Sequence, residues 1–183
     1  MRWLNLIWLL VLGGCTLVPR APTSVSARPG VEKFALNGRI SVSHDGKRFS
    51  AGIRWTHRPQ SDEILLLAPL GATAARVYRD QHSATLDEGD KHYQADDAES
   101  LMQQVLGWHL PLAGMHYWVL GRASKGSPAQ LEYDGEARVV LLRQNGWEVR
   151  YLRYDGNLPA RLQLNQTGVQ VQLLIDEWDQ DPQ

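Results

Sequence analysis

The sequence predicts a mainly β domain: an antiparallel sheet of about ten short strands that curls, with one or two helices packed on its concave side. Apolar and polar residues alternate over most of the chain after residue 33. Asp45-Gly46 and Asn145-Gly146 stand between alternating segments, and both dipeptides are strong signals for tight hairpin turns. A helical pattern after Asp96 breaks the alternation. Hairpin-linked strands with a helical middle are therefore the expected fold.

The first half of the domain predicts five strands. Residues 34–42 and 49–55 form a hairpin in which alternate residues share one face, namely Phe34, Leu36, Gly38, Ile40 and Val42 with Phe49, Ala51, Ile53 and Trp55. Residues 64–68 are a continuous apolar run, which indicates a third strand. Residues 74–78 and 83–86 predict two shorter strands.

The middle of the chain predicts two helical segments. The first begins at residues 97–100, whose acidic side chains suit the positive end of a helix dipole. Its apolar face consists of Leu101, Met102, Val105 and Leu106, and Gly107 is the expected C-cap. A short helical or irregular piece covers residues 115–120, and residues 121–128 form a Gly/Ser/Pro loop.

The last part of the chain returns to strands. Residues 138–144 lead through Asn145-Gly146 into residues 147–154, which predicts a second hairpin. Leu162 and Leu164 alternate with polar residues after a proline, and residues 169–175 form a regular final strand.

The first fifteen residues predict a membrane address and an anchor. Arg2, a short apolar run over residues 3–12 and small residues before a cleavage point are the parts of a secretory signal peptide. The run is too short to span a bilayer, which takes roughly 20 residues. Leu12-Gly13-Gly14-Cys15 resembles a bacterial lipobox, in which the cysteine is lipidated and becomes the mature N-terminus. The alternative is an ordinary signal peptide with a stray cysteine.

The expected domain organisation follows from this anchor. Residues 1–14 are the predicted signal peptide, and residues 15–33 comprise the lipidated cysteine and a Pro/Ser-rich flexible tether. Residues 34–180 form the folded domain. Thr16 follows the cysteine, and by analogy with enterobacterial sorting, where an aspartate tends to retain the lipoprotein at the inner membrane, it permits the outer membrane.

Composition and motifs argue against several function classes. The net charge of −1 gives no electrostatic reason to bind nucleic acid. The six histidines form no metal-binding spacing, and the chain contains no G-x-S-x-G or S-x-x-K motif. The single cysteine is the predicted lipid anchor, so it is neither a nucleophile nor part of an internal disulfide. We therefore expect neither catalysis, nor a metal, nor a cofactor.

A leucine at a turn is the one odd local feature. Pro69-Leu70-Gly71 follows the apolar run at residues 64–68, and Pro and Gly mark a turn. Leu70 is either a tip that touches a membrane or a partner, or a residue that folds back or is simply exposed, as single surface leucines often are.

Several segments, taken in order, resemble the LolB family of outer-membrane lipoprotein receptors. They are Gly38-Arg39-Ile40-Ser41-Val42, Phe49-Ser50, Trp55, Pro69-Leu70-Gly71, Tyr93-Gln94-Ala95-Asp96-Asp97-Ala98-Glu99, Trp118-Val119-Leu120-Gly121, Gln144-Asn145-Gly146-Trp147, Leu158-Pro159 and residues 175–178. The resemblance covers about residues 34–178. Ala123 departs from it, because the family often has proline near this position.

The resemblance implies an unclosed antiparallel β-barrel of ten to eleven strands with helices covering a hydrophobic cavity. It implies a monomeric, non-enzymatic receptor on the periplasmic face of the outer membrane. Such a receptor takes lipoproteins from the soluble carrier LolA and passes them into the inner leaflet. The main rival is a lipoprotein of similar shape that binds protein partners as a structural or assembly factor.

The resemblance also gives candidate site residues. Leu70 becomes a tip that delivers cargo to the bilayer. The candidates for the acyl-chain cavity are the predicted apolar faces, for each of which ordinary core is the alternative: Leu36, Ile40, Phe49, Ile53, Trp55, Leu65, Leu67, Leu101, Val105, Leu106, Trp118, Trp147, Val149, Tyr151, Val171 and Leu173.

Overall fold

The computed structural model describes residues 33–106 and 112–182, which contain eleven strands and two helices. In chain order they are β1 (Phe34–His44), β2 (Lys47–Arg58), β3 (Ser61–Leu67), β4 (Thr73–Arg79), β5 (Ala84–Glu88), β6 (Lys91–Ala95), α1 (Ala98–Leu106), α2 (Leu112–Trp118), β7 (Ala129–Tyr133), β8 (Val139–Gln144), β9 (Trp147–Asp155), β10 (Leu158–Gln166) and β11 (Val169–Asp179). The predicted signal peptide, the predicted lipidated Cys15, the tether up to residue 32 and the predicted C-cap Gly107 lie outside the described residues.

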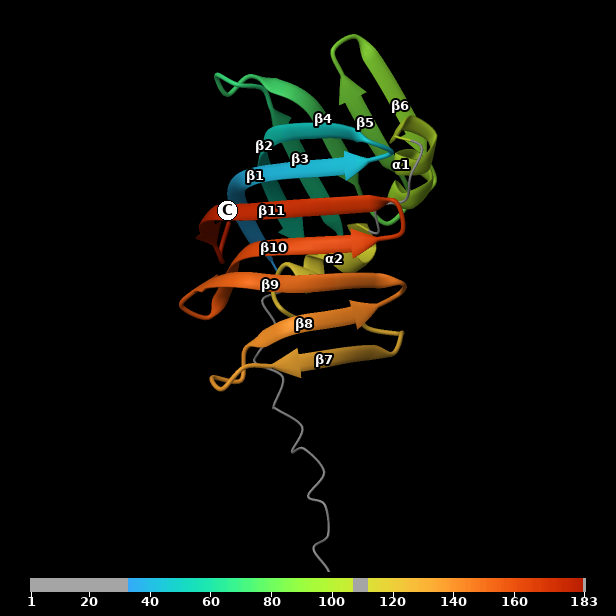
Figure 1. Cartoon of the computed structure of the whole chain (residues 1–183). Helices are drawn as coiled ribbons and strands as arrows, with labels where there is room; N and C mark the ends of the chain where they lie inside the picture. Colours follow the sequence, from blue (N-terminus) through green and yellow to red (C-terminus); the bar gives the residue numbers. More distant parts are fainter. Residues whose placement is uncertain (1–32, 107–111, 183) are drawn as a thin grey trace, which may run out of the picture. The chain divides into compact units, whose positions relative to one another are not determined.

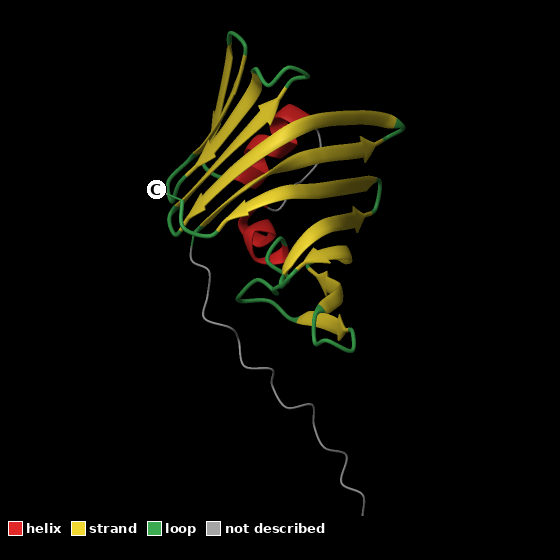
Figure 2. Cartoon of the chain, turned by 90° about the vertical axis from the view of Figure 1, so that its left-hand side faces the viewer, coloured by secondary structure: helices red, strands yellow, loops and turns green. Residues whose placement is uncertain are grey.

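The strands form one antiparallel sheet that does not close. Their order is β6-β5-β4-β3-β2-β1-β11-β10-β9-β8-β7, so β1 pairs with β11 in the middle while β6 and β7 are the edges (Figure 1). The strands curve around the two helices (Figure 2). The predicted fold class, an unclosed antiparallel sheet with helices on its concave side, is confirmed. Neither helix has the length and apolar composition needed to cross a bilayer.

Three elements differ from the prediction. The edge strands β6 and β7 were not expected as strands, because each is five residues long and carries polar and charged side chains, as edge strands commonly do. The second helix begins at Leu112, three residues before the expected helical piece, and ends at Trp118.

The core lies between the inner face of the sheet and the helices. In the described part of the chain, the buried apolar side chains fall between Phe34 and Ile175. The largest of those that are fully buried are Trp55, Trp118, Phe34, Leu36, Leu101 and Leu112. Since the domain holds its own core, we expect a chain that begins at Thr16, without the anchor, to fold.

Gly38 marks a close approach between β1 and β11. Their register shifts between Asn37 and Gly38, and a Cβ atom at Gly38 would lie 2.0 Å from the carbonyl oxygen of Leu174. Because that oxygen belongs to the backbone of a central strand, it can move aside only at a substantial cost in free energy. We predict that Gly38→Ala lowers the free energy of unfolding by roughly 2–3 kcal/mol, measured by urea denaturation.

Gly135→Ala is the matched control, because nothing lies within 4 Å of a Cβ atom at that position. Its effect should stay within about 0.5 kcal/mol. Equal urea midpoints for the two variants would contradict the observed approach of β1 to β11.

Candidate functional site

The inner face of the sheet and the covering helices form one apolar surface. Most of the predicted cavity residues lie on it, each at most 7% exposed: Leu36, Ile40, Ile53, Trp55, Leu101, Trp118, Trp147, Val149, Tyr151, Val171 and Leu173. They come together because alternate residues of β1, β2, β9 and β11 point to the same side. Pairs such as Leu36 with Trp55 and Ile40 with Leu173 face each other across neighbouring strands.

Leu65 and Leu67 lie on the opposite, outer face, contrary to the expectation for β3. Ile64 pairs with Trp55 and Leu66 with Ile53, so alternation turns the two intervening positions away from the core. The run at residues 64–68 is apolar throughout, and it therefore contained no signal that distinguishes the two faces.

Three further candidates have other surroundings. Val105 is half-buried and packs against the core. Phe49 is 49% exposed near the turn between β1 and β2, so the structure does not bring it into the buried surface. Leu106 ends α1, and its side chain lies outside the described residues.

Two short helices cover the inner face. The Asp97 carboxylate caps α1 by accepting a hydrogen bond from the Ser100 backbone N–H at 2.7 Å. The helix packs against β5 and β6. The Glu99 carboxylate accepts a hydrogen bond from the Ala113 backbone N–H of α2 at 3.2 Å, which joins the two helices. Leu101 and Leu112 are almost completely buried, so helix side chains occupy the space over the sheet.

Polar contacts hold the C-terminal end of α2 to β8 and β9. Trp118 Nε1 donates to Gln144 Oε1 at 2.9 Å, and the Tyr151 hydroxyl donates to the Trp118 carbonyl oxygen at 2.8 Å. Burial raises the pKa of Tyr151 well above its usual value, so the hydroxyl stays a neutral donor. Gln144 also donates to the Ser124 and Ser127 carbonyl oxygens, at 2.9 and 3.0 Å, and thereby fixes the loop after the helix.

A buried polar cluster, formed by Trp55, His57, Asp62, Arg79 and His116, lies against the last turn of α2, which supplies His116. Asp62 Oδ1 accepts hydrogen bonds from Trp55 Nε1 at 2.7 Å and His57 Nδ1 at 2.8 Å, and Oδ2 forms an ion pair with Arg79. Burial alone would raise the pKa of Asp62. The His57 hydrogen bond and the Arg79 charge outweigh burial, and the pKa lies below its usual value.

His116 connects this cluster to α2. Its ring stacks on that of His57 with the centroids 4.4 Å apart and the planes 17° from parallel. Burial, together with the charges of His57 and Arg79, lowers the pKa of His116 to about 4, against the opposing charge of Asp62. His116 is therefore neutral while α2 is packed.

Acid should weaken the packing of α2. If α2 leaves the sheet, the pKa of His116 returns to about 6.5, so below that pH the released state binds a proton that the packed state does not. The stability of the packed state therefore falls as the pH drops from about 6.5 to about 4. We predict faster hydrogen exchange of the α2 amides at pH 5 than at pH 7, after correction for intrinsic rates.

His116→Phe is the control for this prediction, because phenylalanine keeps a stacking ring without a titrating group. Its α2 amides should lose most of the pH dependence. An equal pH dependence in both proteins would show that another group is responsible.

The turn between β3 and β4 holds Leu70 in solvent. Its side chain is fully exposed, and its φ of 106° is one that residues other than glycine rarely adopt. The Gly71 N–H donates to the Ala68 carbonyl oxygen at 2.9 Å, and the Ala68 N–H donates to the Ala72 carbonyl oxygen at 2.8 Å. Backbone strain of this kind costs about 1–3 kcal/mol and is concentrated at functional sites.

Comparisons with known proteins agree on one family. The profile of the family "Outer membrane lipoprotein LolB" matches residues 32–178. The chain is 41% identical to the outer-membrane lipoprotein LolB of Nitrosomonas europaea, over 93% of this chain and 88% of the relative. It is 36% identical to the protein of the same name in Chromobacterium violaceum, over 97% of this chain and 98% of the relative.

A solved structure resembles this fold. A LolA superfamily protein of Nitrosomonas europaea superposes with a TM-score of 0.55, covering 85% of this chain and 89% of that one. The two sequences are 11% identical, so the likeness concerns the fold alone.

Proposed function

The chain belongs to the LolB family of outer membrane lipoproteins, and on this premise we propose that it accepts lipoproteins from the periplasmic carrier LolA and inserts them into the inner leaflet of the outer membrane. The protein acts as a receptor, not an enzyme, because the transfer makes and breaks no covalent bond. We propose that lipid on Cys15 anchors it, that residues 16–33 tether the domain, and that residues 34–180 act as a monomer.

The physical problem that such a receptor solves is the exposure of acyl chains to water. A chain of about fifteen methylene groups costs on the order of 12 kcal/mol to expose, at about 0.8 kcal/mol for each group. Several such chains cannot cross the periplasm without an apolar cover. Transfer without ATP further requires that the receptor bind the cargo more tightly than the carrier does, because only a difference in affinity moves it.

The observation that carries the proposal is the apolar inner face of an unclosed sheet, which two short helices cover within residues 33–106 and 112–182. Acyl chains can take the place of the helix side chains on this face without a close match in shape, because the burial of apolar groups is not directional. Leu101 and Met102 of α1 and Leu112, Met115 and Trp118 of α2 are the side chains that would give way. Leu70, held outside on its strained turn, would then contact the bilayer during release.

One observation favours a second candidate, a lipoprotein that binds protein partners in envelope assembly. The inner face is filled by large side chains, of which Trp55 and Trp118 are fully buried. If the helices cannot move away, acyl chains have no place to bind and the sheet is only a scaffold.

Cargo transfer in solution separates the two candidates. LolA loaded with a lipoprotein is mixed with the chain from Thr16 to Gln183, and the two proteins are then separated. We expect the cargo on this domain, and no return to LolA when the experiment is run in reverse. Cargo that stays on LolA while the domain is folded would rule out the receptor and favour the assembly factor.

A further inference from the structure

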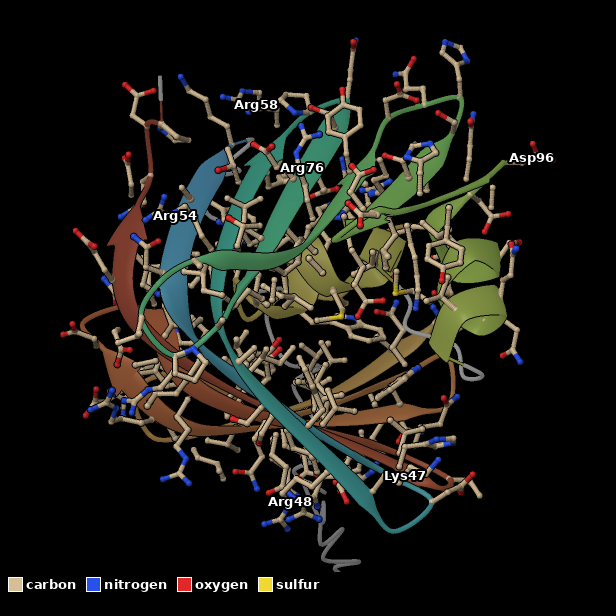
Figure 3. All side chains as sticks on the ribbon, turned by 90° about the horizontal axis from the view of Figure 1, so that it is seen from above. Lys47, Arg48, Arg54, Arg58, Arg76 and Asp96 are labelled. Atoms are coloured by element: carbon tan, nitrogen blue, oxygen red, sulfur yellow. The ribbon has the colours of Figure 1, made fainter. Side chains whose placement is uncertain are left out.

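The β1–β2 hairpin projects past the strand beside it. β1 and β2 stay paired up to His44 and Lys47, whereas β2 pairs with β3 only from Gly52 onward. Five residues, roughly 16 Å of strand, therefore extend beyond β3. On its other side the hairpin is supported by β11, because His44 at the end of β1 pairs with Val169. Figure 3 shows Lys47 at the far end of this hairpin.

The start of β2 carries two cations and an exposed aromatic ring. Within the part of the chain that the structure describes, neither Lys47 nor Arg48 has an ion-pair partner, and Phe49 is half-exposed. Asp45 in the turn lies 3.5 Å from His44. Further along the sheet, by contrast, arginines of the outer face are engaged with neighbouring side chains. Arg54 donates to Asn37, Arg76 to Glu63, and Arg39 pairs with Asp176.

The Leu70 turn lies at this same end of the sheet. Leu67, the last residue of β3, pairs with Gly52, so the β3–β4 turn that carries Leu70 follows at the level where the unpaired part of β2 begins. The β8–β9 and β10–β11 turns at this end, Asn145-Gly146 and Thr167-Gly168, are uncharged. The acidic β5–β6 turn is also at this end, because Asp87 pairs with Arg76 and Gly89-Asp90 follow it toward the level of the start of β4.

We propose that Lys47, Arg48 and Phe49 form, with the Leu70 turn, a membrane-contact surface that binds anionic phospholipids such as phosphatidylglycerol. The cations bind lipid phosphates while the ring lies at headgroup depth, which is where aromatic side chains are enriched. This inference rests on the proposed function and extends it by naming the lipid class and the residues that orient the domain for release. Leu70 supplies apolar insertion, and the hairpin supplies electrostatic attraction.

Vesicle binding tests the proposal with the chain from Thr16 to Gln183. Vesicles of phosphatidylcholine, with or without one-third phosphatidylglycerol, are sedimented with the protein at low salt. We expect binding only with phosphatidylglycerol, and its loss at high salt. Lys47→Glu/Arg48→Glu should weaken binding at least ten-fold, because each cation near such a surface contributes about five-fold.

The matched control reverses two charges at the other end of the same strand, Arg54→Glu/Arg58→Glu (Figure 3). It should bind vesicles like the unmodified chain. Equal binding by the Lys47/Arg48 variant and the unmodified chain would overturn the proposal, as would an equal loss in the Arg54/Arg58 control.

Transfer from LolA in solution, without vesicles, distinguishes this proposal from the proposed function. The Lys47/Arg48 variant should take up cargo at the normal rate. Slower uptake with normal vesicle binding would make the hairpin a carrier-docking surface and overturn the proposal. If the unmodified chain takes up no cargo, the proposed function fails, whatever the vesicles show.

Discussion

Leu70→Glu should leave folding and cargo uptake unchanged and slow release of cargo into vesicles at least ten-fold. The side chain is fully exposed, so its replacement removes no packing. Burial of a leucine in an apolar phase is worth about 1.5–3 kcal/mol, which corresponds to roughly ten- to a hundred-fold, and a carboxylate adds a desolvation cost. The measurement is the rate at which cargo loaded on the domain appears in sedimented vesicles.

Two further variants test the cause of this effect. Leu152→Glu is the matched control, because Leu152 on β9 is also an exposed leucine. This variant should release cargo normally. Leu70→Gly removes the side chain but adopts the φ of 106° without strain, so it should be at least as stable as the unmodified chain and still release slowly. Normal release by Leu70→Glu would refute the delivery role of the turn.

Asp62→Asn should lower the free energy of unfolding by about 3 kcal/mol at pH 7, near the lower end of the range for breaking a buried ion pair. The amide can still accept hydrogen bonds from Trp55 and His57. It no longer balances the charge of Arg79, whose side chain is 23% exposed. Because His57 stacks on His116, α2 should also lose part of its protection from hydrogen exchange.

Asp87→Asn provides the control, since Asp87 also lies near an arginine, at 4.0 Å from Arg76, but on an exposed part of the sheet. Exposed ion pairs contribute at most about 1 kcal/mol. The two variants are compared by urea denaturation. If both variants lose the same small free energy of unfolding, the buried Asp62 carboxylate does not stabilise the fold as we expect.

Alternation and turn dipeptides were enough to predict most of the sheet. The β1–β2 and β8–β9 hairpins lie on either side of Asp45-Gly46 and Asn145-Gly146 as expected, with positive φ at all four residues. The edge strands β6 and β7 escaped prediction because one strand partner and a polar sequence leave only a weak periodic pattern. The family resemblance, rather than periodicity, indicated that the sheet is unclosed.

The site was predictable only where one face of a strand differs from the other. Ile53 and Trp55 alternate with polar residues, which predicted their shared face, whereas the uniform apolar run in β3 left the direction of Leu65 undetermined. The buried polar cluster is a tertiary feature. Asp62 and His116 are 54 positions apart, and nothing local indicates that α2 brings the second histidine onto the first.

Site-specific photocrosslinking on β3 tests most directly whether cargo acyl chains occupy the inner face. A photoreactive amino acid is placed at Leu66, which packs toward the core, or at its neighbour Leu65, which points to the outer face. Each protein is loaded with lipoprotein from LolA and irradiated. We predict crosslinks to the acyl chains from position 66 and almost none from position 65. Equal crosslinking from both positions, or crosslinking from position 65 alone, would contradict the account.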